Sequence, residues 1–248
     1  MHHRIHADRK YTAEKALRWL HHDPRKDFFR QAMSFINYEK VEGDIVEFGV
    51  GVGKSLALLC MMHEEDKKYW RYNDEILSNR KLIGFDAFEG LPSFAEHHPR
   101  WDIATFSSNY EIYHPWLTWQ EPISEESVTD LFTLVELPLP QLEKGWFDAT
   151  LPYSRNHISK IALAHIDCDV YESTRTVLWT MEPALQDGSL LLFDDYFCYK
   201  AHPRKGEARA LHEFSQHFPH WHIIPYHAYS TFGNSFILHD KRITADYV

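Results

Sequence analysis

Several features that mark particular protein classes are scarce in this 248-residue sequence. It holds three cysteines, Cys60, Cys168 and Cys198, and no CxxC pair, which argues against a disulfide framework or a cysteine-based zinc site and predicts a reducing, cytoplasmic location. The opening MHHRIHADRK lacks the apolar stretch of a secretory signal. The longest apolar run, Leu56 to Met62, is far shorter than the ~20 residues that cross a bilayer, so no membrane contact is expected.

Positively charged residues are also fewer than negatively charged ones. With 26 Lys and Arg against 36 Asp and Glu, the net charge is −10, which argues against a nucleic-acid backbone as partner. Hydrophobic residues make up 44% of the chain and aromatic residues 15%, which is enough apolar area for one sizeable core and excludes a disordered protein. We therefore expect a single domain over residues 1–248, with helices in the first 40 residues.

The order of hydrophobic patterns predicts strands that alternate with helices. Strand patterns cover residues 44–48, 81–86, 131–137, 161–166 and 190–193, and a terminal antiparallel hairpin covers 221–227 and 235–239. Helix patterns cover residues 14–20, 28–36, 54–62 and 207–218, and a further helix begins with Ser173 as its N-cap and ends at Gly188. This alternation predicts an α/β, Rossmann-like fold with a seven-stranded, mostly parallel sheet.

A glycine-rich loop follows the first predicted strand, in the stretch EFGVGVGKS from Glu47 to Ser55. A phosphate-binding P-loop needs a glycine where Phe48 stands, and the dinucleotide pattern GxGxxG would end on Lys54 or Leu56. What remains is an acidic residue followed by GxGxG, which resembles the first motif of methyltransferases that use S-adenosylmethionine (SAM). Alternate glycines let the backbone approach a ligand closely, and Glu47 offers a negative charge to an ammonium group. The alternative is a tight strand-to-helix turn without a ligand.

Carboxylates follow three other predicted strands. Asp86 ends the second strand, where an acid can accept both hydroxyls of a ribose or simply cap the strand end. Asp167 and Asp169 stand two residues apart after the fourth strand, and Asp194 and Asp195 follow the fifth. Carboxylates gathered at one sheet edge repel each other unless a cation intervenes, and oxygen ligands suit Mg²⁺ or Mn²⁺. Alternatively, these acids cap the helices that follow.

The segment 93–130 is irregular and aromatic. Its Trp and Tyr residues predict a lid over a bulky hydroxylated substrate, since aromatic rings cover the apolar faces of sugars and flat rings. A second small core or a subunit interface is the alternative. The residues concerned are Trp101, Tyr110, Tyr113, Trp116 and Trp119.

Five stretches, taken together and in order, resemble the macrocin O-methyltransferase (TylF/MycF-type) family of metal-dependent sugar O-methyltransferases. They are VEFGVGVGKS (46–55), GFDAFEGLP (84–92), KGWFDATLP (144–152), DCDVYEST (167–174) and FDDY (193–196). The resemblance implies a class I methyltransferase fold, Mg²⁺ ligation by Asp167, Asp194 and Asp195, and SAM contacts from Glu47, Gly49, Gly51, Gly53, Ser55 and Asp86, with Trp146 nearby. The chain departs from the family at Cys168, where a glycine is usual, and over 93–130.

The sequence therefore predicts an enzyme that moves a methyl group from SAM to a hydroxyl of a small molecule, with Mg²⁺ or Mn²⁺ assistance and with Asp167 or Asp169 taking the proton. One alternative is a glycosyltransferase that uses Asp167-Cys-Asp169 as a DxD metal site. Another is a methyltransferase-like fold that serves as a binding module without catalysis. The expected partner is a hydroxylated small molecule, and a homo-oligomer stays open.

Overall fold

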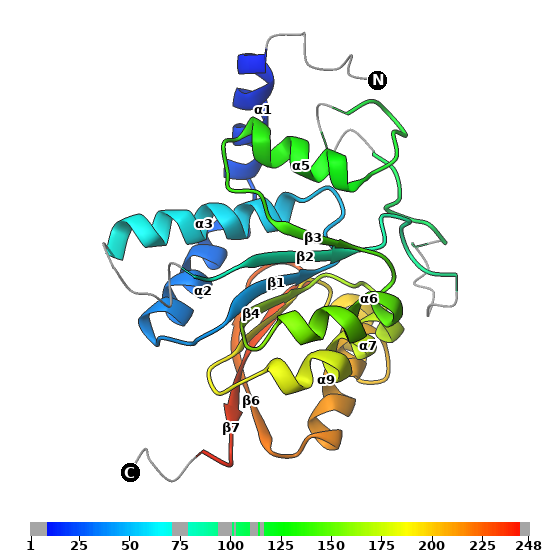
Figure 1. The fold of residues 1–248 in the computed structure, drawn as a ribbon. Coiled ribbons are helices and arrows are strands. Elements are labelled where there is room, and N and C mark those ends of the chain that lie inside the picture. Colours follow the sequence, from blue (N-terminus) through cyan, green and yellow to red (C-terminus); the bar gives the residue numbers. More distant parts are fainter. Residues whose placement is uncertain are drawn as a thin grey trace.

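The computed structural model describes residues 9–70, 79–93, 101, 103–109, 114 and 117–243. Its centre is a seven-stranded sheet in the order β3-β2-β1-β4-β5-β7-β6 (Figure 1). The strands are β1 (Asp44–Phe48), β2 (Leu82–Asp86), β3 (Gln141–Lys144), β4 (Ile161–Ile166), β5 (Leu190–Phe193), β6 (Trp221–Ala228) and β7 (Asn234–Asp240). β1 to β5 pair in parallel, whereas β7 pairs antiparallel with both β5 and β6. The predicted mostly parallel sheet with a terminal hairpin is confirmed.

Helices cover both faces of this sheet. One layer is α1 (Arg9–His21), α2 (Lys26–Tyr38), α3 (Lys54–Trp70) and α5 (Glu125–Leu134), and their apolar residues share one buried cluster. The other is α6 (Phe147–Ser154), α7 (Tyr171–Met181) and α9 (Gly206–His217), which lie together below the sheet in Figure 1 and share the second cluster. Shorter elements are the 3₁₀ turns η1 (Arg155–His157) and η2 (Glu182–Ala184) and the helix α8 (Cys198–Ala201).

The central strands are buried because both of their faces are covered. All six residues of β4 and all four of β5 are buried, as the uninterrupted apolar runs IALAHI and LLLF predict for central parallel strands. Within β4 the one titratable residue is His165, which is fully buried. His165 belongs to the candidate active site.

The prediction of a strand over residues 131–137 is wrong. Those residues fall in and just after helix α5, and the strand that pairs with β2 is β3, at residues 141–144. A capping box starts the helix: the Ser127 amide donates to Ser124 Oγ at 3.4 Å, and the Ser124 amide donates to Ser127 Oγ at 3.1 Å. Val128, Leu131 and Phe132 are buried at helical spacing, so the run LFTLVEL carried a helical pattern as well.

The predicted N-cap of the helix after β4 is also wrong. α7 begins at Tyr171 after Val170, which makes no side-chain cap, and Ser173 lies in the first turn instead. The helix ends at Met181 and continues as η2, so it stops before Gly188.

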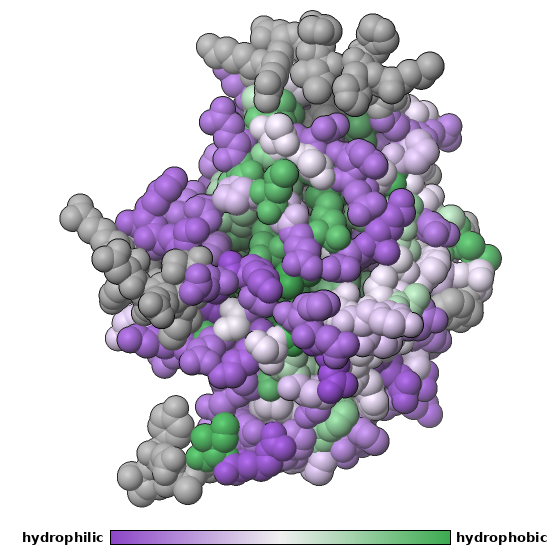
Figure 2. All heavy atoms as spheres, in the orientation of Figure 1, coloured by the Kyte–Doolittle hydropathy of each residue, from purple (hydrophilic) through white to green (hydrophobic). Residues whose placement is uncertain are grey.

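The surface is largely polar. Hydrophilic side chains cover most of the face seen in Figure 2, and apolar ones gather in the upper half of that view. Within the part of the chain that the structure describes, no helix combines the length and apolar character needed to cross a membrane.

Candidate active site

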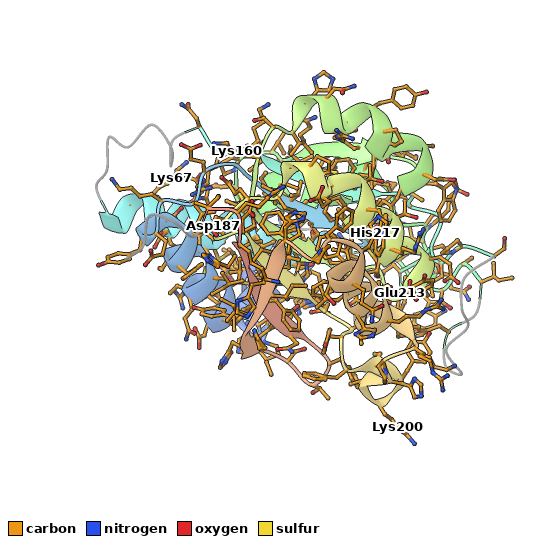
Figure 3. All side chains as sticks on the ribbon, turned by 90° about the horizontal axis from the view of Figure 1, so that it is seen from below. Lys67, Lys160, Asp187, Lys200, Glu213 and His217 are labelled. Carbon is orange, nitrogen blue, oxygen red and sulfur yellow. The ribbon has the colours of Figure 1, made fainter. Side chains whose placement is uncertain are left out.

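A cavity of about 580 Å³ opens where the carboxyl ends of β1, β2, β4 and β5 meet. This is the edge at which open α/β sheets bind ligands. Nine residues predicted for the site line it: Gly49, Gly51, Ser55, Asp86, Trp146, Asp167, Asp169, Asp194 and Asp195. Two predicted residues, Glu47 and Gly53, are not among the lining residues. The six side chains labelled in Figure 3 also lie outside the lining: Lys67, Lys160, Asp187, Lys200, Glu213 and His217.

The three glycines of the loop after β1 serve different purposes. All three have a positive φ, which L side chains rarely adopt. A Cβ at Gly49 would lie 1.9 Å from the Asp167 carbonyl oxygen, and one at Gly53 would lie 2.8 Å from a Val128 methyl group, so both positions require glycine for packing. A Cβ at Gly51 would meet nothing within 4 Å. Gly51 is therefore the glycine whose missing side chain leaves room for a ligand in the cavity.

Asp86 ties the glycine loop to the end of β2. Its carboxylate accepts a hydrogen bond from the Gly51 amide at 2.7 Å and another from the Phe88 amide at 2.6 Å. Burial raises the pKa of Asp86, and these backbone donors oppose that rise. The carboxylate thus holds the loop in place at the edge of the cavity.

Trp146 reaches the cavity from the start of α6. It precedes Phe147 as the N-cap residue of that helix, and the Gly145 amide donates to the Asp86 carbonyl at 2.9 Å. Its place beside the cavity came from family resemblance alone, and the structure puts it in the lining.

Four aspartates lie together in the lining of the cavity. Asp167, Asp169 and Asp195 offer oxygens that lie within 4.8 Å of one another, and Asp167 forms a second such group with Asp194 and His165. Residues two apart on a strand share a face, but β4 ends at Ile166, before Asp167, and Asp169 has a φ of 61°. The left-handed turn, rather than strand alternation, brings Asp169 to Asp167.

The carboxylates of this cluster are crowded, and the crowding changes their pKa values. Burial, together with the neighbouring carboxylates, raises the pKa of Asp167 and Asp169 well above the usual range and also raises that of Asp195. Burial acts in the same direction on Asp194, but the Arg25 guanidinium and His165 outweigh it and lower the pKa of Asp194. A divalent cation among these oxygens would relieve the repulsion, and hard oxygen donors suit Mg²⁺ or Mn²⁺.

Four side chains at this cluster were not predicted: Arg25, His165, Glu207 and Tyr229. Arg25, just before α2, lies with Nη1 3.1 Å from Asp194 Oδ1 and also pairs with Asp23. Glu207 of α9 is fully buried and accepts hydrogen bonds from the amides of Cys168, at 3.3 Å, and Asp195, at 3.0 Å. It therefore braces the two aspartate-bearing turns against each other.

No local motif marks Arg25, Glu207 or Tyr229, because each reaches the cluster only through the fold. His165 stood in the motif HIDCD, and its place two residues before Asp167 was the available signal.

Glu47 and His165 form a buried pair beneath the cluster. Neither side chain is exposed, and Glu47 Oε1 lies 2.7 Å from His165 Nδ1. His165 Nε2 lies 3.7 Å from Asp194 Oδ1. Burial alone would lower the pKa of His165, but Asp194 and Glu47 raise it to about 10. Glu47 is thus engaged with His165 and does not line the cavity.

The predicted lid segment contributes four described residues to the cavity lining, namely Trp101, Thr105, Phe106 and Ile123. It is fixed to the loop after β2, because the Leu91 amide donates to the Thr105 carbonyl at 3.1 Å. Trp119 is 58% exposed and is not in the lining. Tyr110, Tyr113 and Trp116 lie outside the described residues.

Comparison with known protein families shows to which family the chain belongs. The profile of the family described as macrocin O-methyltransferase (TylF) matches residues 20–218, most of the chain. The chain belongs to the macrocin O-methyltransferase family. The match contains the glycine loop, Asp86, Trp146 and all four aspartates.

Two streptomycete proteins have sequences related to this chain. The chain is 28% identical over 176 residues to demethyldecarbamoylnovobiocin O-methyltransferase of Streptomyces niveus, covering 69% of this chain and 60% of that protein. It is 26% identical over 174 residues to a tetracenomycin rhamnosyl 4'-O-methyltransferase of Streptomyces olivaceus, 8-demethyl-8-(2,3-dimethoxy-alpha-L-rhamnosyl)-tetracenomycin-C 4'-O-methyltransferase, again covering 69% and 60%. The matched region thus spans about 60% of the length of these relatives.

A solved structure supports the fold of this family member. The O-methyltransferase NovP superposes with a TM-score of 0.62 at 24% identity, over 87% of this chain and 80% of that one. At that identity the likeness establishes the fold, which is that of the class I methyltransferases.

Proposed function

We propose that the protein is a SAM-dependent O-methyltransferase that methylates a hydroxyl of a small natural product, such as one of its sugars, with the help of Mg²⁺ or Mn²⁺. The observation that carries the proposal is one cavity that holds both the glycine loop at Gly51 and the four-aspartate cluster. Family membership supports the reaction class, and the names of the relatives support a hydroxylated acceptor.

SAM would lie along the glycine loop. Gly51 leaves room for it, Gly49, Ser55 and Trp146 line the same space, and Asp86 offers its carboxylate at the strand end where a ribose would lie. The sequence assigned Gly53 and Glu47 to the same ligand. Gly53 instead packs close to Val128, and Glu47 is buried against His165.

The aspartates would hold the cation and move the proton. Asp167, Asp194 and Asp195 supply its oxygen ligands, and a bound cation lowers the pKa of an acceptor hydroxyl. Asp167 or Asp169 would take the hydroxyl proton, since both carboxylates line the cavity beside the proposed cation site. Bound SAM would supply the methyl group to the acceptor oxygen and would leave as S-adenosylhomocysteine (SAH). The aromatic walls at Trp101 and Phe106 would cover the acceptor and keep water out.

Calorimetry with SAM, SAH, ATP and a sugar nucleotide tests this proposal against its alternatives. We expect SAM and SAH to bind and the other two not to bind. Binding of the sugar nucleotide without SAM would favour the DxD glycosyltransferase instead. Turnover is then measured as SAH release with a panel of small glycosides bearing two adjacent hydroxyls, with and without EDTA. SAM binding with no metal binding would point to the non-catalytic module.

A further inference from the structure

Glu47 is the acidic residue of the glycine motif, yet it faces the interior. It lies on β1 opposite His165 of β4, and its side chain is fully buried. Register partners on neighbouring parallel strands project to the same face, which explains the 2.7 Å contact between Glu47 Oε1 and His165 Nδ1. Its other oxygen is buried and has no hydrogen-bond partner among the residues that the structure describes.

His165 lies between Glu47 and the aspartate cluster. Its Nδ1 contacts Glu47. Its Nε2 is buried, lies 3.7 Å from Asp194 Oδ1, and has no hydrogen-bond partner within the described part of the chain. The ring of Phe29 packs edge-on against the imidazole, with centroids 5.3 Å apart. The histidine is therefore fixed between one carboxylate and the next.

Asp194 receives donors on one oxygen. Arg25 Nη1 lies 3.1 Å from Oδ1, and the Tyr229 hydroxyl lies 3.4 Å from the same atom, to which His165 Nε2 also points. Among the described residues no hydrogen bond reaches Oδ2. Donors that hold Oδ1 set the direction of the carboxylate and leave Oδ2 to a cation.

We propose that Glu47 and His165 are positioning residues. Through the contact chain Glu47–His165–Asp194 they hold Asp194 in the orientation in which it binds the divalent cation, and Glu47 does not contact SAM. This rests on the proposed function. Partners that orient a metal ligand from behind typically change metal affinity 10–100-fold when they are removed. This contact chain assigns Glu47 to the cation site, whereas the glycine motif assigns it to the cofactor.

The test compares two ligands on one variant. Glu47→Gln keeps the size of the side chain and removes its charge, and the matched control is Asp44→Asn on the same strand, whose carboxylate accepts the Lys81 amide outside the cavity. We expect Glu47→Gln to weaken Mn²⁺ binding at least about tenfold by calorimetry, to leave SAH affinity within about twofold, and to regain turnover at excess Mn²⁺. Asp44→Asn should change neither affinity.

The opposite pattern, weaker SAH binding with unchanged Mn²⁺ binding, would place Glu47 on the cofactor and overturn the proposal. A second measurement needs no variant and so does not depend on its folding. Pulsed electron paramagnetic resonance of Mn²⁺ in the wild-type protein should show no directly bound histidine nitrogen. A bound nitrogen would make His165 a ligand and refute its positioning role. Wild-type protein that binds SAH but no Mn²⁺ would refute the metal part of the proposed function, and with it the positioning role of Glu47 and His165.

Discussion

Replacing Gly51 separates a cofactor-binding glycine from a merely structural one. Its amide donates to Asp86 at 2.7 Å, its φ is +50°, and an added Cβ would meet no atom within 4 Å. Gly51→Ala therefore adds one carbon at the cavity without a clash in the protein, and Gly51→Val adds two further methyl groups to that carbon. The fold should survive both changes.

The size of each effect follows from this geometry. The left-handed backbone costs an L residue about 1–2 kcal/mol, which in a chain of this size lowers Tm by roughly 2–8 °C. A side chain in the space of the ligand should weaken SAH binding at least about tenfold, or about 1.4 kcal/mol, and more for valine than for alanine. Circular dichroism gives the Tm, and calorimetry with SAH gives the affinity.

Gly188→Ala is the matched control. Gly188 also has a positive φ, +84°, but it lies before β5 at the opposite edge of the sheet, where a Cβ would come within 2.9 Å of Val41. This variant should lose stability and keep full SAH affinity. A folded Gly51→Val protein that binds SAH as tightly as the wild type would show that the ligand does not approach the loop, and the reasoning would be wrong.

Three further predictions concern the cation, the acceptor and pH. Asp194→Asn should keep SAH affinity and lose at least about tenfold in Mg²⁺ affinity and turnover, because it removes one charge from the cluster; full-rate methylation in EDTA would contradict this. Trp101→Ala should raise KM for the acceptor and leave SAH affinity unchanged, whereas the exposed Trp119→Ala should do neither; equal effects of the two would argue against a lid. Burial lowers the pKa of His63 from 6.5 to about 4, so the unfolded chain binds more protons between these values and stability falls as pH falls. At pH 5.5 this amounts to about 1.4 kcal/mol, and urea unfolding of His63→Gln should lose that part of the pH dependence; an unchanged dependence would refute it.

The strands that carry the site could be predicted because their signals are local. The strands β1, β4 and β5 are almost entirely buried and mostly apolar, and a glycine or an aspartate directly follows each of them. Once the sheet is parallel, these ends meet at one edge. The cavity lining at Gly51, Asp86 and Asp194 follows from that alone.

The rest could not be predicted because it depends on contacts between distant segments. Helix α5 carries an apolar run that suits a strand as well, and its capping box decides the outcome. Arg25 and Glu207 reach the cluster from helices whose positions only the complete fold sets. For Glu47 the motif was found, but the direction of its side chain depends on its partner across the sheet, His165.

A crystal structure of the protein with SAH and Mn²⁺ tests the central claim most directly, because it locates both ligands at once. We predict SAH along the glycine loop beside Gly51 and Asp86, and an anomalous manganese peak among the oxygens of Asp167, Asp194 and Asp195. Manganese elsewhere, or SAH outside this cavity, would contradict a metal-assisted methyl transfer at this edge of the sheet.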